Sequence, residues 1–173
     1  MRIKLFSLVI YCLLFISVYG QEEGALHNLQ QQATKMSTAF VNGDYKTFAK
    51  YTYPAILKSM GGIEKMVTVL TKRTNDIKKQ GMSFSRITFG EPSKIVKTDK
   101  ELQATIPQHT EIKLSDGRLI SSSTLIAISS DNGSNWTFID TSDKDMASLR
   151  RALPNLSRAI TIPRQQQPIK YSL

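Results

Sequence analysis

Cysteine is almost absent from this chain of 173 residues, whose only cysteine, Cys12, lies in the apolar N-terminal stretch. If that stretch is removed, the remaining chain has no disulfide, no thiol nucleophile and no cysteine metal ligand. Such a domain must be held together by its hydrophobic core. At this length about two-thirds of the unfolded surface can be buried, which is sufficient for one stable domain.

Histidine is nearly as scarce, because only His27 and His109 are present. The H-E-x-x-H and EF-hand spacings that hold metal ions are both missing. The G-x-S-x-G motif of a serine nucleophile and the Gly-rich phosphate loop after a strand are missing as well. The sequence therefore predicts no metal site and no cofactor.

Acidic residues are outnumbered, with 14 Asp and Glu against 23 Lys and Arg, and the formal net charge is +9. A basic balance can indicate nucleic acid or anionic surfaces as partners. Here the basic residues are spread along the whole chain instead of forming one cluster. We therefore predict no nucleic-acid partner.

The first twenty residues have the pattern of a secretory signal peptide. Arg2 and Lys4 form a basic start, residues 5–18 are almost continuously apolar, and the stretch ends in the small residue Gly20. The apolar run is short for a membrane span of about 20 residues, and no later run reaches that length. We predict cleavage near Gly20 and a secreted or periplasmic protein without a stable membrane anchor.

The next part of the chain has helical periodicity. Apolar residues recur three and four positions apart over 26–40 and predict an amphipathic helix that stops at Asn42-Gly43. Asp44 is suited to cap a short second helix. Tyr53-Pro54 breaks that helix and begins a third, because proline disfavours the helical conformation in the residue before it. Residues 63–80 predict a fourth, strongly amphipathic helix.

From Met82 onward, β-branched and aromatic residues alternate with polar ones, which is typical of strands. Asp116-Gly117 and Asn132-Gly133 predict tight hairpin turns between antiparallel strands. Pro107 predicts an edge, a bulge or a kink within its strand. The predicted strands cover 82–89, 93–98, 101–114, 118–130 and 134–140.

After the strands, Ser142-x-x-Asp145 predicts the start of a last short helix, which Pro154 closes. Residues 164–173 are predicted to be a flexible polar tail. The order of elements predicts an α+β fold in which N-terminal helices pack on an antiparallel meander sheet, followed by a short C-terminal helix. We expect a single domain over residues 21–163.

The stretches NGDYKTFAKYTYP, MGGIEKMVTVLTK and GSNWTFIDTS, with the ending LRRALPNL, carry a family resemblance. In this order they resemble the nuclear transport factor 2-like superfamily, also called cystatin-like or SnoaL-like, and its secreted bacterial members in particular. The resemblance covers about residues 25–163. It implies a curved sheet that wraps a long helix into a cone with an interior pocket. That superfamily includes isomerases, dehydratases and cyclases, together with many non-catalytic binding or assembly domains.

Asp140 and His109 are the two acid–base candidates for catalysis. Asp140 ends the last predicted strand and could point into the mouth of a cone, although a strand-end cap for Ser142 explains it as well. His109 and Glu111 share one strand face, but the apolar residues Ala104 and Ile106 occupy the opposite phase. That phase favours solvent exposure of His109 and Glu111.

Four aromatic residues are candidates for a ligand pocket: Tyr51, Tyr53, Trp136 and Phe138. The two tyrosines flank the predicted helix break, and Trp136 and Phe138 share a strand face. The alternative for all four is packing in the core or in a dimer contact.

Two functions are compatible with the sequence. The first is a secreted, non-enzymatic binding or interaction module, forming a homodimer, with an apolar pocket for a small ligand between the sheet and the helices. The alternative is an isomerase- or cyclase-like enzyme that uses Asp140 or His109 in an aromatic pocket. A third, simpler interpretation is an assembly domain whose interior is filled.

Overall fold

The structure is a computed structural model that describes residues 3–172, with side chains described for 21–172. The predicted signal peptide, residues 1–20, lies outside the residues whose side chains are described. Across the described residues, no helix combines the length and the apolar character that a membrane crossing needs.

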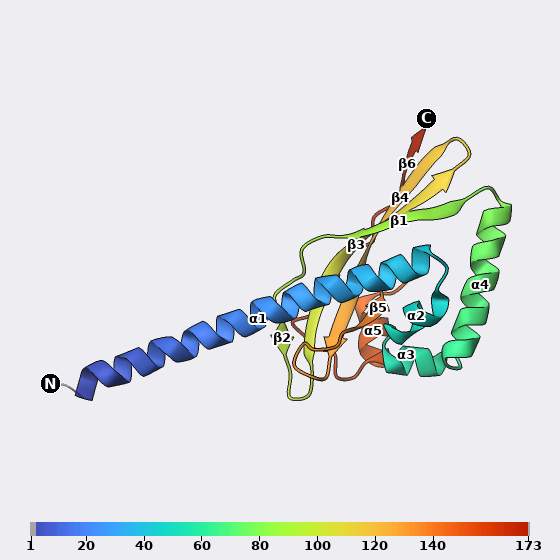
Figure 1. Ribbon diagram of the computed structural model, residues 1–173. Helices are drawn as coiled ribbons and strands as arrows, with labels where there is room; N and C mark the ends of the chain where they lie inside the picture. The colour runs from blue at the N-terminus through green and yellow to red at the C-terminus, as the bar shows by residue number, and fades with distance from the viewer. Residues whose placement is uncertain (1–2, 173) are drawn as a thin grey trace.

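Four helices form the N-terminal half: α1 (Ile3–Val41), α2 (Tyr45–Lys50), α3 (Pro54–Ser59) and α4 (Ile63–Lys79). Figure 1 shows α1 crossing over the sheet, with α4 on the far side of the short helices α2 and α3. The sequence predicted the C-terminal end of α1 and the positions of the other three helices, and these are confirmed. The Asp44 carboxylate caps α2 by accepting a hydrogen bond from a backbone N–H of its first turn, as expected.

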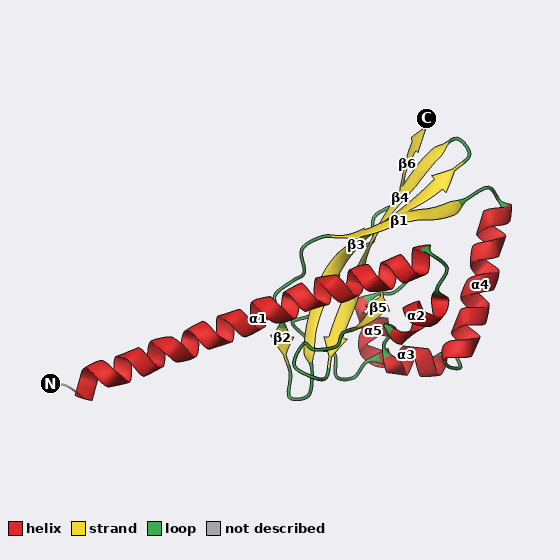
Figure 2. Ribbon diagram, viewed as in Figure 1, coloured by secondary structure: helices red, strands yellow, loops and turns green. Residues whose placement is uncertain are grey.

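Six antiparallel strands form one sheet in the order β1-β3-β4-β5, with β2 beside β3 and β6 beside β4. Figure 2 shows that the strands form a twisted, curved sheet with α1 lying across it. The predicted α+β fold with antiparallel strands is confirmed. The strands are β1 (Ser83–Phe89), β2 (Val96–Lys97), β3 (Leu102–Leu114), β4 (Gly117–Ser129), β5 (Thr137–Asp140) and β6 (Ile169–Ser172).

Pro107 lies within β3 at a place where the sheet has a local edge. Its carbonyl accepts a hydrogen bond from the N–H of Gly90 at 3.0 Å, just beyond the end of β1. The N–H and C=O of one strand residue point to the same side, so the proline nitrogen also faces this side. The regular pairing of β1 with β3 ends at Phe89 and Gln108, directly before Pro107. The proline therefore coincides with the end of the β1 pairing.

The C-terminal part differs from the prediction in two places. Residues 164–168 are exposed and have no regular secondary structure, but β6 pairs with Gly117–Ile120 of β4, so the last part of the predicted flexible tail is a strand. The helix α5 (Met146–Ala152) begins with Asp145 as its N-cap, whose carboxylate accepts from the N–H of Ser148 at 2.7 Å. The predicted cap at Ser142 was wrong because Asp145 already supplies that acceptor.

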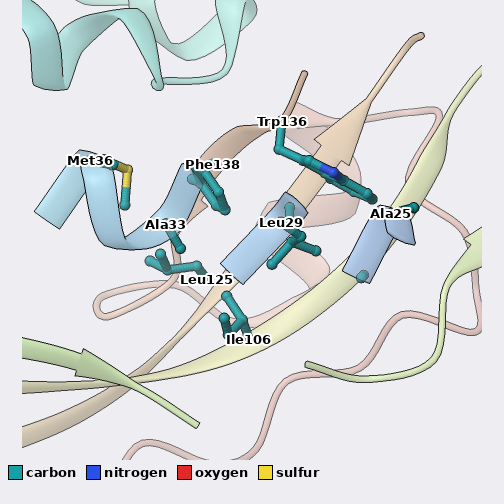
Figure 3. Packing of buried hydrophobic residues seen from close by; sticks show 10 residues of the cluster. Ala25, Leu29, Ala33, Met36, Ile106, Leu125, Trp136 and Phe138 are labelled. Carbon is teal, nitrogen blue, oxygen red and sulfur yellow. The ribbon is translucent and has the colours of Figure 1, made fainter. Parts of the chain in front are cut away.

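The main core lies between α1 and one face of the sheet. Leu29 and Ala33 of α1 are completely buried in one cluster with Ala104 of β3 and Ala127 of β4. Figure 3 shows the Trp136 ring extending toward α1 in this cluster. Burying these apolar side chains is the main source of stability that a chain without disulfides has.

The opposite face of the sheet is also covered. Ile126, Ile128 and Ile139 point to this face and pack on Leu149 of α5 and on the chain that follows it. The strands are therefore buried on both faces at this end of the sheet.

The turn between β4 and β5 is fastened to α1 by side-chain amides. Asn28 donates to the carbonyls of Gly133 and Ser134 at 2.6 and 2.8 Å. Gln32 donates to the carbonyl of Ser134 at 2.9 Å and accepts from the backbone N–H of Trp136, also at 2.9 Å. This contact fixes where the end of the sheet lies along α1.

Gly133 is the residue of this turn that tolerates substitution least. Its φ is +86°, and a Cβ would come within 2.6 Å of the Cβ of Ala25. We expect Gly133→Ala to lower the free energy of unfolding by about 1–3 kcal/mol. Gly43→Ala is the matched control, since its φ is +78° but no atom lies within 4 Å of an added Cβ. Chemical denaturation of both variants measures the difference, and equal losses would contradict a clash at Gly133.

The carboxylate of Asp131, in the same turn, makes the stability of the protein depend on pH. Its carboxylate accepts hydrogen bonds from the backbone and side-chain N–H groups of Asn135, at 2.8 and 2.7 Å, and these lower the pKa of Asp131. A lowered pKa in the folded state stabilises the protein above the unfolded value of about 3.9, and this contribution is lost as the pH falls through the folded value. We expect Asp131→Asn to reduce stability at neutral pH, with the difference from wild type shrinking below about pH 4.

Denaturation at a series of pH values tests this expectation, with Asp143→Asn as a control at an exposed aspartate outside the turn. A stability deficit of Asp131→Asn that stays constant down to the acid end of the series would contradict a role for the charged carboxylate.

Candidate functional site

The segment Tyr51-Thr52-Tyr53 is the joint between the helices and the sheet. Phe138 of β5 donates its backbone N–H to the carbonyl of Tyr51 at 2.7 Å, and its carbonyl accepts from the N–H of Tyr53 at 3.1 Å. Tyr53 has an extended backbone, with φ −53° and ψ 131°, as expected for a residue before proline. The helix break at Pro54 therefore lets this segment pair with the edge of β5.

Beside this joint lies a cavity of about 420 Å³ that is partly open to solvent. Its volume is within the range of about 300–1,000 Å³ that is typical of small-molecule sites. Residues from the four N-terminal helices and from β1, β3, β4 and β5 contribute to its wall. The apolar wall consists of Met36, Phe40, Phe48, Ile56, Met60, Met66, Phe84, Ile87, Leu125, Phe138 and Ile139.

Three of the four phenylalanines in this wall form one aromatic cluster. The ring of Phe40, at the end of α1, lies 4.9 Å from the ring of Phe84 and 5.2 Å from that of Phe48, measured between centroids. Tyr45 meets the same ring edge-on at 5.7 Å. These distances fall in the favourable range for aromatic pairs, so α1, α2 and β1 are held together at the cavity.

The cavity exists because α4 does not pack closely on the sheet. Only Met66 and Thr74 of α4 are buried, although the helix is strongly amphipathic. Its main packing partner is α2, and it has only a few contacts with β1 of the sheet. The space that a closely packed helix would fill is therefore left between α4 and the strands.

The polar residues of the wall are Thr52, Arg73, Gln108, Thr110, Asp140 and Lys144. Arg73 and Lys144 are exposed, and neither side chain forms an ion pair among the residues that the structure describes. Asp140 is exposed too, and its carboxylate accepts hydrogen bonds from the backbone N–H and the hydroxyl of Ser142. Asp140 thus caps the end of its strand, which was the alternative to a catalytic role.

Only one of the four aromatic pocket candidates, Phe138, lines the cavity. Trp136 is 1% exposed in the main core, and its indole N–H donates to the carbonyl of Gly133 at 3.1 Å. Tyr51 packs against the main core and Tyr53 against the second core. Of the four candidates the structure brings only Phe138 to this cavity, whereas Tyr51, Tyr53 and Trp136 pack with the two cores, which was the alternative for them.

Tyr53 has an altered acidity in its position. Burial raises the pKa of its phenol, and the nearby negative charge of Glu101 raises it further. The hydroxyl is therefore kept protonated, and nothing in this arrangement prepares it as a base.

His109 and Glu111 lie on the sheet face opposite the cavity, as the strand phase predicted. His109 is exposed, and its Nδ1 lies 3.0 Å from the hydroxyl of Ser122. Glu111 accepts from the hydroxyl of Ser85 at 3.0 Å and lies 3.8 Å from Arg118. The structure thus separates His109 from Asp140, so the two acid–base candidates do not form one site.

Phe40, Phe48 and Phe84 are among the wall residues that the sequence did not identify. Phe40 and Phe48 stand on either side of the Asn42-Gly43 turn, and their spacing indicated only helix faces directed toward a core. A pocket would have been indicated if the apolar face of α4 were larger than the surface that its neighbours can cover. That comparison requires the position of the sheet, which the sequence alone does not supply.

The described residues contain no group of three or more His, Cys, Asp or Glu side chains that could hold a metal ion. No family model matches the chain, and no curated protein is significantly similar to it. The nuclear transport factor 2-like resemblance therefore stays a prediction.

The aromatic wall can be tested by a double-mutant cycle on Phe40 and Phe84. We expect Phe40→Leu and Phe84→Leu each to reduce stability, with a coupling of about 0.5–1.5 kcal/mol between them, because their rings pack edge to face. Phe40→Leu combined with Phe89→Leu is the control, since no ring contact joins those two residues. Denaturant unfolding of all variants gives the couplings, and additive losses at Phe40 and Phe84 would contradict the observed ring contact.

Proposed function

We propose that the protein is a non-enzymatic binding module that holds a small apolar ligand in the cavity between the helices and the sheet. The observation that carries this proposal is the composition of the cavity wall, in which eleven of seventeen residues are apolar. An unfilled apolar space of this size inside a small domain costs stability, so a function that uses it explains why it persists. The same unfilled space disfavours the alternative of an assembly domain with a filled interior.

The isomerase- or cyclase-like alternative finds little support at this cavity. Such an enzyme needs a desolvated acid or base next to the bound substrate. Asp140 is the one carboxylate in the wall, and it is exposed and bonded to its neighbour Ser142. His109 lies on the other face of the sheet.

Secretion and dimer formation belong to the same proposal. Export to the periplasm or the cell exterior is supported by the basic and apolar pattern of the first twenty residues. A homodimer, and membership of the nuclear transport factor 2-like superfamily, are supported by the sequence stretches that resemble that superfamily. None of these three points is needed for a ligand to enter the cavity.

The proposal predicts that a neutral apolar probe binds inside the cavity. N-phenyl-1-naphthylamine should show enhanced fluorescence with the wild-type protein, because its emission rises when it leaves water. Thr110→Phe should reduce this binding at least about tenfold, since the new ring would occupy the space beside Ile87. Fluorescence titration measures both dissociation constants.

Thr88→Phe is the matched control, because Thr88 is an exposed strand residue next to Ile87 that does not line the cavity. It should bind the probe like the wild type. The proposal is contradicted if the wild type does not bind the probe, or if Thr110→Phe and Thr88→Phe bind it equally well.

A further inference from the structure

The charged residues of the cavity wall point to the chemistry of the ligand. Among the seventeen wall residues, two are cations, Arg73 and Lys144, and one is an anion, Asp140. Arg73 comes from α4, and Lys144 comes from the connection between β5 and α5. Two elements far apart in the sequence therefore bring positive charge to one apolar cavity.

Neither cation is neutralised by the described part of the protein. The ion pairs found there are Lys79–Asp76, Arg118–Glu111 and Lys170–Asp116, and none of them involves the cavity. The carboxylate of Asp140 is directed to Ser142, from which it accepts two hydrogen bonds. The wall therefore carries one net positive charge whose partner is not supplied by a neighbouring side chain.

The chemical character of the cavity wall also changes along α4. Met66 and Arg73 are seven residues apart, so they lie on nearly the same side of the helix and about 10 Å apart along its axis. The thioether of Met66 is buried in the protein, whereas Arg73 is exposed. Along this one stripe the wall changes from apolar and buried to cationic and accessible to solvent.

We propose that the ligand is an amphipathic carboxylate, a single alkyl chain with one carboxylate head. The chain would lie along the wall of Phe40, Phe48 and Phe84, and the carboxylate would meet Arg73 and Lys144 at the open side. A guanidinium presents a planar pair of donors that matches a carboxylate, and an ammonium adds a second charge-assisted hydrogen bond. This inference rests on the proposed binding function and specifies the chemical class of its ligand.

The experiment compares saturated alkyl carboxylates with alcohols and amines of the same chain length. Each compound displaces N-phenyl-1-naphthylamine from the purified protein, below its micelle concentration. We expect the carboxylate to bind about five to ten times more tightly than the alcohol, because the two cations are exposed to solvent. The amine should bind more weakly than the alcohol. Affinity should rise about fourfold for each added methylene until the cavity is full.

Substitutions at the two cations identify what recognises the head group. Arg73→Gln and Lys144→Gln should each reduce the ratio of carboxylate to alcohol affinity, and the double substitution should bring it close to one. Lys72→Gln is the matched control, because Lys72 is the exposed neighbour of Arg73 on α4 and does not line the cavity. That variant should keep the wild-type ratio.

The possible failures can be told apart. If carboxylate and alcohol bind equally to the wild type, or if the amine binds most tightly, the carboxylate proposal is overturned, while binding of the neutral probe still supports a cavity for apolar ligands. If Lys72→Gln lowers the ratio as much as Arg73→Gln, the preference reflects the overall positive charge, and the assigned site is overturned. If the neutral probe does not bind either, the proposed function itself fails.

Discussion

Two backbone hydrogen bonds to Phe138 hold the segment between the short helices α2 and α3 to the sheet. They come from Tyr51 and Tyr53, on either side of a buried threonine whose hydroxyl contacts the sulfur of Met66. The helices α2 and α3 are too short to be stable by themselves, and α4 packs mainly on α2. The position of α4, and therefore the cavity beneath it, depends on this joint.

Pro54 is the local cause of the joint. It forces Tyr53 out of the helical conformation, so the chain leaves the helix at the point where β5 has an open edge. Pairing there satisfies the backbone groups of Phe138, which would otherwise be an exposed strand edge. It also decides where the side chains go: Phe138 faces the cavity, while the two tyrosines pack against the cores on the two faces of the sheet.

Each helix covers a different amount of the sheet surface, and this difference explains why there are two cores and one cavity. α1 covers its face of the sheet with fully buried residues such as Leu29 and Ala33. α5 and the chain after it close the opposite face. On α4, by contrast, only Met66 and Thr74 are buried, and the remaining space is walled by phenylalanines and methionines. Charged residues occur in that wall only where it is open to solvent.

Most elements of the fold could be predicted from the sequence, because their signals are local. The turn at Asn42-Gly43, the cap at Asp44 and the hairpin at Asp116-Gly117 each depend on a few adjacent residues. The strand phase also placed His109 on the polar face correctly. Local signals of this kind survive in the folded protein because tertiary contacts agree with them.

The parts that failed depend on distant contacts. Nothing near Tyr51 indicates that its carbonyl will meet Phe138, so the direction of its ring could not be predicted. The strand β6 forms because the beginning of β4 offers a free edge, although its own residues are exposed on both faces. The cavity was implied only by a family resemblance, and its wall of Phe40 and Phe84 joins elements that are far apart in sequence.

The central claim is that the space under α4 is an accessible apolar cavity, and xenon tests it most directly because this gas enters apolar cavities without needing a head group. Methyl NMR spectra of the purified protein would be recorded with and without xenon pressure. We expect shifts at the methyl groups of Met36, Met66 and Leu125, which line the cavity, and none at Leu149 in the second core. Unchanged spectra at the three lining residues, or equal shifts at Leu149, would contradict the account.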